Sequence, residues 1–75
     1  MTNYAIAVLP PFGSVTFRFV TNIYRSPKNG ELIVRLSDYL DNAVILNNAD
    51  AARVLMYDAQ QAYPHLEFIL WYLDD

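Results

Sequence analysis

Apolar residues in this chain of 75 residues recur with two different periods, and the change of period separates predicted strands from one predicted helix. The first apolar run covers residues 4–9 and ends at Pro10 and Pro11, which cannot donate to a strand ladder. Residues 14–22 then alternate, with Val15, Phe17 and Phe19 on one side and Thr16, Arg18 and Val20 on the other. Alternation of this kind predicts a half-buried antiparallel strand.

A hairpin is predicted next, because Pro27 and the pair Asn29-Gly30 separate two apolar runs. The third strand is predicted over residues 31–36, with Leu32, Val34 and Leu36 on one face and Ile33 and Arg35 on the other. Residues 37–42 are rich in turn formers and have room for one helical turn. The short apolar run at residues 43–46 is a candidate for one further strand.

One helix is predicted to begin at Asn47 or Asn48, whose side chains can accept from unpaired backbone amides, and to end before Pro64. At about 100° per residue, the helical segment separates into a polar and an apolar stripe. The polar stripe contains Asp50, Arg53, Tyr57, Gln60 and Gln61, and the apolar stripe contains Ala51, Ala52, Leu55, Met56, Ala59 and Ala62. Because the apolar stripe is mostly alanine, we expect the helix to lie close against the sheet.

The last strand is predicted over residues 65–73, directly after Pro64. The order β-β-β-(β)-α-β indicates an α+β fold of two layers, in which one helix packs on a four- to five-stranded, mostly antiparallel sheet. If residues 43–46 and 65–73 share one sheet, their helical connection places them parallel with a right-handed crossover. The chain shows no repeat, low-complexity segment or linker, which indicates one domain over residues 1–75.

The last predicted strand is apolar on both faces, although the chain offers a single helix to cover it. Leu66, Phe68, Leu70 and Tyr72 line one face, and Ile69, Trp71 and Leu73 line the other. A large exposed apolar patch on a soluble protein marks an association surface. We therefore expect an interface at Ile69, Trp71 and Leu73, aided by Val20 and Ile33. The alternative is that residues 38–46 fold over this face and close it.

Composition limits the partners that this chain can have. Its net charge is −3 and its five cations are spread along the sequence, which argues against binding to nucleic acid. No cysteine is present, the amino-terminal residues lack the basic region of a signal peptide, and no stretch approaches the roughly 20 apolar residues of a membrane span. We expect a cytoplasmic protein that binds neither a membrane, a cofactor nor a small-molecule substrate.

Few residues indicate chemistry. Asp58 falls at the edge of the apolar stripe, where we expect it to reach solvent or to pair with Arg18 or Arg35; acid-base catalysis is the alternative. His65 and Glu67 share a strand face, but two ligands are too few for a catalytic zinc site. The serines Ser14, Ser26 and Ser37 lie at turns without a neighbouring base, and Gly13 and Gly30 do not form a phosphate loop.

The sequence therefore favours a non-enzymatic interaction protein, a homodimer or a module that docks on a protein partner. A short chain with an alanine-rich helix before a hydrophobic strand resembles many small phage or prophage products; this likeness of shape involves no motif and assigns no residue roles. The alternative function is an acidic inhibitor that mimics the charge of nucleic acid on a basic protein. That inhibitor would present Glu31, Asp38, Asp41, Asp74 and Asp75 on one face.

Overall fold

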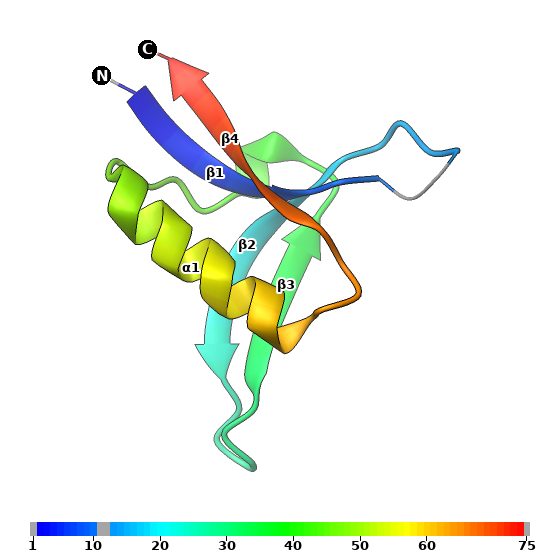
Figure 1. The fold of residues 1–75 in the computed structure, drawn as a ribbon, viewed down its shortest axis with the longest axis vertical. Coiled ribbons are helices and arrows are strands. Elements are labelled where there is room, and N and C mark those ends of the chain that lie inside the picture. The colour runs from blue at the N-terminus through cyan, green and yellow to red at the C-terminus, as the bar shows by residue number, and fades with distance from the viewer. Residues whose placement is uncertain (1, 11–12, 75) are drawn as a thin grey trace.

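One helix packs on a four-stranded antiparallel sheet in the computed structural model, which describes residues 2–10 and 13–74. The elements in chain order are β1 (Thr2–Val8), β2 (Arg18–Arg25), β3 (Leu32–Ser37), the 3-10 turn η1 (Leu40–Asn42), α1 (Ala49–Ala62) and β4 (Phe68–Asp74). The strand order is β3-β2-β1-β4, so the first and last strands are neighbours and β3 and β4 are the edges (Figure 1). The predicted α+β class and its two layers are confirmed.

The sheet consists of two ribbons that meet at one end. β1 pairs with β4 from Thr2↔Asp74 to Val8↔Phe68, and β2 pairs with β3 in the predicted hairpin. The ribbons are joined where β1 meets β2, through the pairs Ala7↔Phe19 and Val8↔Arg18. Figure 1 shows them diverging from this junction, with β1 and β4 running toward the chain ends and β2 and β3 toward the hairpin turn.

Residues 43–46 lie in the fork between the two ribbons. The amide of Val44 donates to the carbonyl of Val20 at 3.0 Å, and Leu46 and Tyr4 exchange backbone hydrogen bonds of 2.7 and 2.8 Å. The segment predicted as a short strand thus forms one isolated antiparallel bridge, Tyr4↔Leu46. Because Leu46 and β4 are both antiparallel to β1, they run in the same direction, as the helical connection predicted, and β1 lies between them.

Helix α1 begins where its sequence places a capping residue. The Asn48 side chain accepts from the amides of Asp50 and Ala51 at 2.8 and 3.1 Å, which satisfies two of the unpaired donors of the first turn. The helix ends at Ala62, two residues before Pro64, as predicted. Ala52 and Ala59 are fully buried, so the helix does approach the sheet closely through its small residues.

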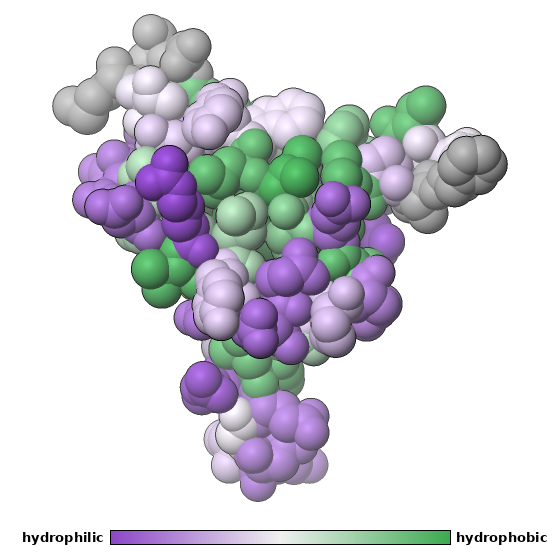
Figure 2. Space-filling model, viewed as in Figure 1, coloured by the Kyte–Doolittle hydropathy of each residue, from purple (hydrophilic) through white to green (hydrophobic). Residues whose placement is uncertain are grey.

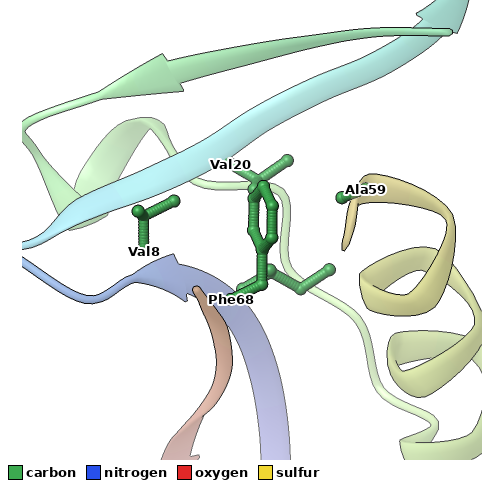
Figure 3. Packing of buried hydrophobic residues seen from close by; sticks show 5 residues of the cluster. Val8, Val20, Ala59 and Phe68 are labelled. Atoms are coloured by element: carbon green, nitrogen blue, oxygen red, sulfur yellow. The ribbon is translucent and has the colours of Figure 1, made fainter. Parts of the chain in front are cut away.

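The core lies between α1 and the sheet. Figure 3 shows Phe68 extending from β4 toward Val20 of β2, with Val8 and Ala59 on either side. Ile6 completes this cluster, and partly buried side chains surround it, among them Leu55 and Met56 of α1, Val44 and Leu46 of the fork, and Ile23, Val34 and Leu36 of the hairpin. Residues from every strand and the helix therefore hold the two ribbons together.

Two strands are shorter than their sequence patterns predicted. β2 begins at Arg18 rather than at residue 14, because the Ser14 hydroxyl accepts from the Thr16 amide at 3.3 Å in a turn that leaves Val15 91% exposed. β4 begins at Phe68 rather than at residue 65, because the Leu66 amide turns back to the carbonyl of Tyr63 at 3.1 Å. No helix among the described residues is long and apolar enough to cross a membrane.

Candidate interaction surface

The face of the β1–β4 ribbon opposite α1 carries a cluster of apolar side chains, which we call the aromatic face. Side chains alternate along a strand, so Ile6, Val8 and Phe68 point toward α1 and their neighbours point away. The outward pairs are Ala5↔Trp71, Ala7↔Ile69 and Asn3↔Leu73. The aromatic face comprises Ala5, Ala7, Phe17, Phe19, Ile69, Trp71 and Leu73.

Trp71 is the centre of the aromatic face. Its ring meets Phe17 at a centroid distance of 5.2 Å and an angle of 65°, and Phe19 at 5.3 Å and 89°. These are edge-to-face contacts, the arrangement that the charge distribution of aromatic rings favours. Directly beside Trp71 in the ladder is Ala5, which is fully buried and whose small side chain leaves room for the indole. Trp71 and Phe17 nevertheless stay half-buried.

The sequence left open whether residues 38–46 close this face, and the structure places two apolar residues of this segment, Val44 and Leu46, elsewhere. Val44 and Leu46 pack against the core on the side of α1. Partial cover comes instead from Phe17 and Phe19, which precede and begin β2. Ile69, Trp71 and Leu73 are each half-buried, so the chain shields this apolar surface without enclosing it.

The five residues expected at the interface do not all lie together. Ile69, Trp71 and Leu73 share the aromatic face. Ile33 lies on the same side of the sheet as Ser37, the partner of Phe19, but four positions further along β3, which is about 13 Å at ~3.3 Å per residue. Val20 is fully buried in the core below α1, so it contributes nothing to an exposed surface.

The outer edge of β4 adjoins the aromatic face and carries backbone groups that have no partner among the described residues. The amide of Leu9 donates to the carbonyl of Glu67 at 2.9 Å, whereas Tyr4 directs its backbone groups away from β4, to Leu46. In an antiparallel ladder, inward and outward residues alternate. The amides and carbonyls of Leu70 and Tyr72 therefore point away from β1, toward the edge of the sheet, as the amide of Phe68 does.

The Gln60 side chain protects the beginning of this edge. Its Oε1 accepts from the Phe68 amide at 3.2 Å, and its Nε2 donates to the carbonyls of Leu66 and Tyr63 at 2.6 and 3.3 Å. The sequence placed Gln60 in the polar stripe of the helix and did not predict this role. The one sequence signal for it is the position of Gln60, one turn before Pro64. Beyond Phe68 no described side chain bonds the outward backbone groups of Leu70 or Tyr72.

The residues considered for chemistry lie apart. Asp58 is exposed, in agreement with the expectation that it reaches solvent, and it borders a shallow pocket with Arg25, Glu31 and Tyr63. His65 is exposed, with its ring 6.2 Å from that of Tyr63. Among the described residues, no group of three or more histidines and carboxylates is arranged to hold a metal ion.

Each of the three serine hydroxyls accepts a hydrogen bond from a backbone amide two residues further on. Ser14 accepts from Thr16, Ser26 from Lys28 at 3.3 Å, and Ser37 from Tyr39 at 3.1 Å. Bonds of this kind stabilise turns and compete with regular secondary structure. The serines therefore have a structural explanation at the positions where the sequence already indicated turns.

The carboxylates of the alternative function are spread over the molecule. Glu31 precedes β3 and Asp38 follows it, so about 20 Å of strand separates them. Asp41 lies in η1, and Asp74 is the last residue of β4 at the far end of the other ribbon. Asp75 lies outside the described residues.

Hydrophobic surface gathers between α1 and β4 in the view of Figure 2, whereas the turn of the β2–β3 hairpin is hydrophilic. The chain matches no known protein-family model, no curated protein and no solved structure.

Proposed function

We propose that this protein is a small non-enzymatic interaction module, which associates with a second protein chain through the aromatic face. The observation that carries the proposal is the partly buried group of Ile69, Trp71 and Leu73 on the side of the sheet opposite α1, which the chain does not enclose. Ala5, Ala7 and Phe19 on this face are already buried, whereas Ile69, Trp71 and Leu73 become fully buried only when further protein covers them.

The composition of this surface supports association. Tryptophan and other aromatic residues are enriched in the centres of protein interfaces, where they bury a large area with few rotatable bonds. Trp71 is held in place by Phe17 and Phe19, so its ring is oriented before a partner arrives. An anchor that is already ordered loses less conformational entropy on binding.

The test is replacement of Trp71 by glutamate, with the mass of the assembly measured by light scattering after size-exclusion chromatography. We expect the wild-type chain to be larger than a monomer and Trp71→Glu to be a folded monomer, because a buried unpaired carboxylate strongly disfavours the interface. Leu73→Glu, at the end of the same face, is a second variant that disturbs the contacts of Trp71 less.

Tyr57→Glu is the matched control, because Tyr57 is an aromatic residue of α1 that is 64% exposed and lies outside the aromatic face. It should leave the mass of the assembly unchanged. A monomeric wild-type chain, together with a Trp71→Glu variant that loses its circular dichroism signal, would assign Trp71 to the core and contradict the proposal.

A further inference from the structure

We infer that two copies of this chain associate edge to edge, with β4 of one copy antiparallel to β4 of the other in one continuous sheet. The inference rests on the proposed function and names both the partner and the contact. Its basis is the outer edge of β4, where the backbone groups of Leu70 and Tyr72 point away from the sheet.

The edge of β4 lacks the features with which soluble proteins block strand addition. Edge strands are usually short, bulged, covered, or interrupted by proline or lysine. β4 pairs with β1 at seven successive positions without a register shift, and its sequence FILWYLD contains neither proline nor a cation. Gln60 covers the Phe68 amide and leaves the following residues accessible. Such an edge adds a strand readily.

The hydrogen-bonding pattern of β4 is self-complementary. If a two-fold axis passes through Trp71, Leu70 lies opposite Tyr72 of the second copy, and both residues have outward-facing amides and carbonyls. Each therefore finds a donor and an acceptor in the other, as an isologous contact between identical strands requires.

This register also extends the aromatic face. Residues opposite one another across an antiparallel pair share a face, so Trp71 meets Trp71 of the second copy and Ile69 meets Leu73. The half-buried side chains of the proposed interface thereby contact one another across the new strand pair. A different protein could add a strand to this edge, but the same residues supply both halves of the contact when the partner is a second copy.

Neighbouring registers fit less well. An axis at Leu70 would pair Tyr72 with Phe68, whose amide is already bonded to Gln60. An axis at Tyr72 would pair Leu70 with Asp74 and bring a carboxylate into the apolar ladder. The axis at Trp71 places Phe68 opposite Asp74, but only at the two ends of the ladder. It keeps the central pair of Leu70 and Tyr72 clear of both Gln60 and Asp74, which is why we assign it.

The inference is tested by Tyr72→Pro compared with Tyr72→Thr. Both variants remove the same aromatic side chain, which is 63% exposed, but proline also removes the outward amide. Because this amide is not bonded to β1, proline is compatible with an edge position here. We expect Tyr72→Thr to dimerise within about threefold of the wild type, and Tyr72→Pro to raise the dimer dissociation constant by about 100-fold or more.

A measurement on the wild-type chain gives a second readout that needs no variant. The amides of Leu70 and Tyr72 should exchange with solvent rapidly in dilute solution and slowly at concentrations above the dissociation constant. The Val15 amide, in an exposed turn, serves as the reference that concentration should not affect.

The outcomes separate this inference from the proposed function. If Trp71→Glu abolishes the dimer but Tyr72→Pro and Tyr72→Thr dimerise equally, with concentration-independent exchange at Leu70 and Tyr72, the chains associate through the face alone and edge pairing is wrong. A wild-type chain that stays monomeric at all concentrations overturns edge pairing between copies. Loss of the dimer in Tyr72→Pro but not Tyr72→Thr supports it.

Discussion

The two edges of the sheet, β3 and β4, differ in how far the chain covers them. On β3 the Val34 amide donates to the Tyr63 hydroxyl at 3.4 Å, and on β4 the Phe68 amide donates to Gln60 at 3.2 Å. Both partners come from the carboxyl-terminal end of α1, so one end of one helix reaches both edges.

The remaining parts of the two edges are unlike. β3 has six residues, carries the exposed cation Arg35, and lies beside a bulge in β2. β4 has seven residues in unbroken register and is apolar up to Asp74. Charge and irregularity discourage strand addition, and a regular apolar strand favours it. Contacts from the same end of α1 therefore leave the two edges unequal, and β4 is the edge more open to strand addition.

Phe68→Ala should have the largest effect on the β4 edge, because Phe68 is the β4 residue that enters the core. Loss of a buried phenylalanine ring should lower the free energy of unfolding by about 3–5 kcal/mol. Total stabilities of small domains are about 5–15 kcal/mol, so much of the stability should disappear. Urea denaturation followed by tryptophan fluorescence measures the change.

Tyr72→Ala is the control for Phe68→Ala, since Tyr72 lies on the same strand but is 63% exposed. Its edge-to-face contact with Tyr4, at 5.4 Å, accounts for a loss of about 1 kcal/mol. Similar losses for the two variants would show that Phe68 does not anchor β4 to the core.

Gln60→Leu tests how much the cover of the β4 edge contributes, because it removes the hydrogen-bonding groups while keeping the size of the side chain. Three backbone groups lose a partner, and we expect a loss of about 1–3 kcal/mol in unfolding free energy together with faster exchange of the Phe68 amide. Gln61→Leu, at the exposed neighbouring position, should change stability by no more than about 0.5 kcal/mol. Equal effects at both positions would refute the role assigned to Gln60.

Tyr63→Phe makes the corresponding change at the β3 edge and should have the smallest effect. The bond from Val34 to the Tyr63 hydroxyl is long, so we expect a loss of about 0.5 kcal/mol and faster hydrogen exchange at Val34. Tyr57→Phe removes an exposed hydroxyl of the same helix and is the control. Unchanged exchange at Val34 in Tyr63→Phe would mean that the hydroxyl does not cover this edge.

Local signals in the sequence were sufficient for much of the fold. Asn48 and Pro64 limit the helix through capping and through a missing amide, and the structure has the helix between them. Asn29-Gly30 predicted the hairpin, in which Gly30 adopts a φ of +73°. The alternation of Phe17 and Phe19 put both rings on the side where they meet Trp71.

The features that the sequence did not reveal depend on residues far apart in the chain. Strand order is set by β4 lying beside β1, which no local pattern encodes. Val15 continued the alternation of the second strand, but the Ser14 turn removes it from the ladder. Val20 was expected at the interface and is instead in the core, because its neighbour Phe19 takes the aromatic face.

The adjacency of β1 and β4 has a consequence for biosynthesis. A ribosome delivers β1 first among these strands and β4 last, so most of β1 waits for its main partner while the intervening chain is made. The β2–β3 hairpin needs only local contacts and forms early, whereas closure of the β1–β4 ribbon is the most non-local and therefore the slowest step. Until that step, Ala5, Ile6 and Ala7, which are fully buried in the folded chain, lack the cover of β4.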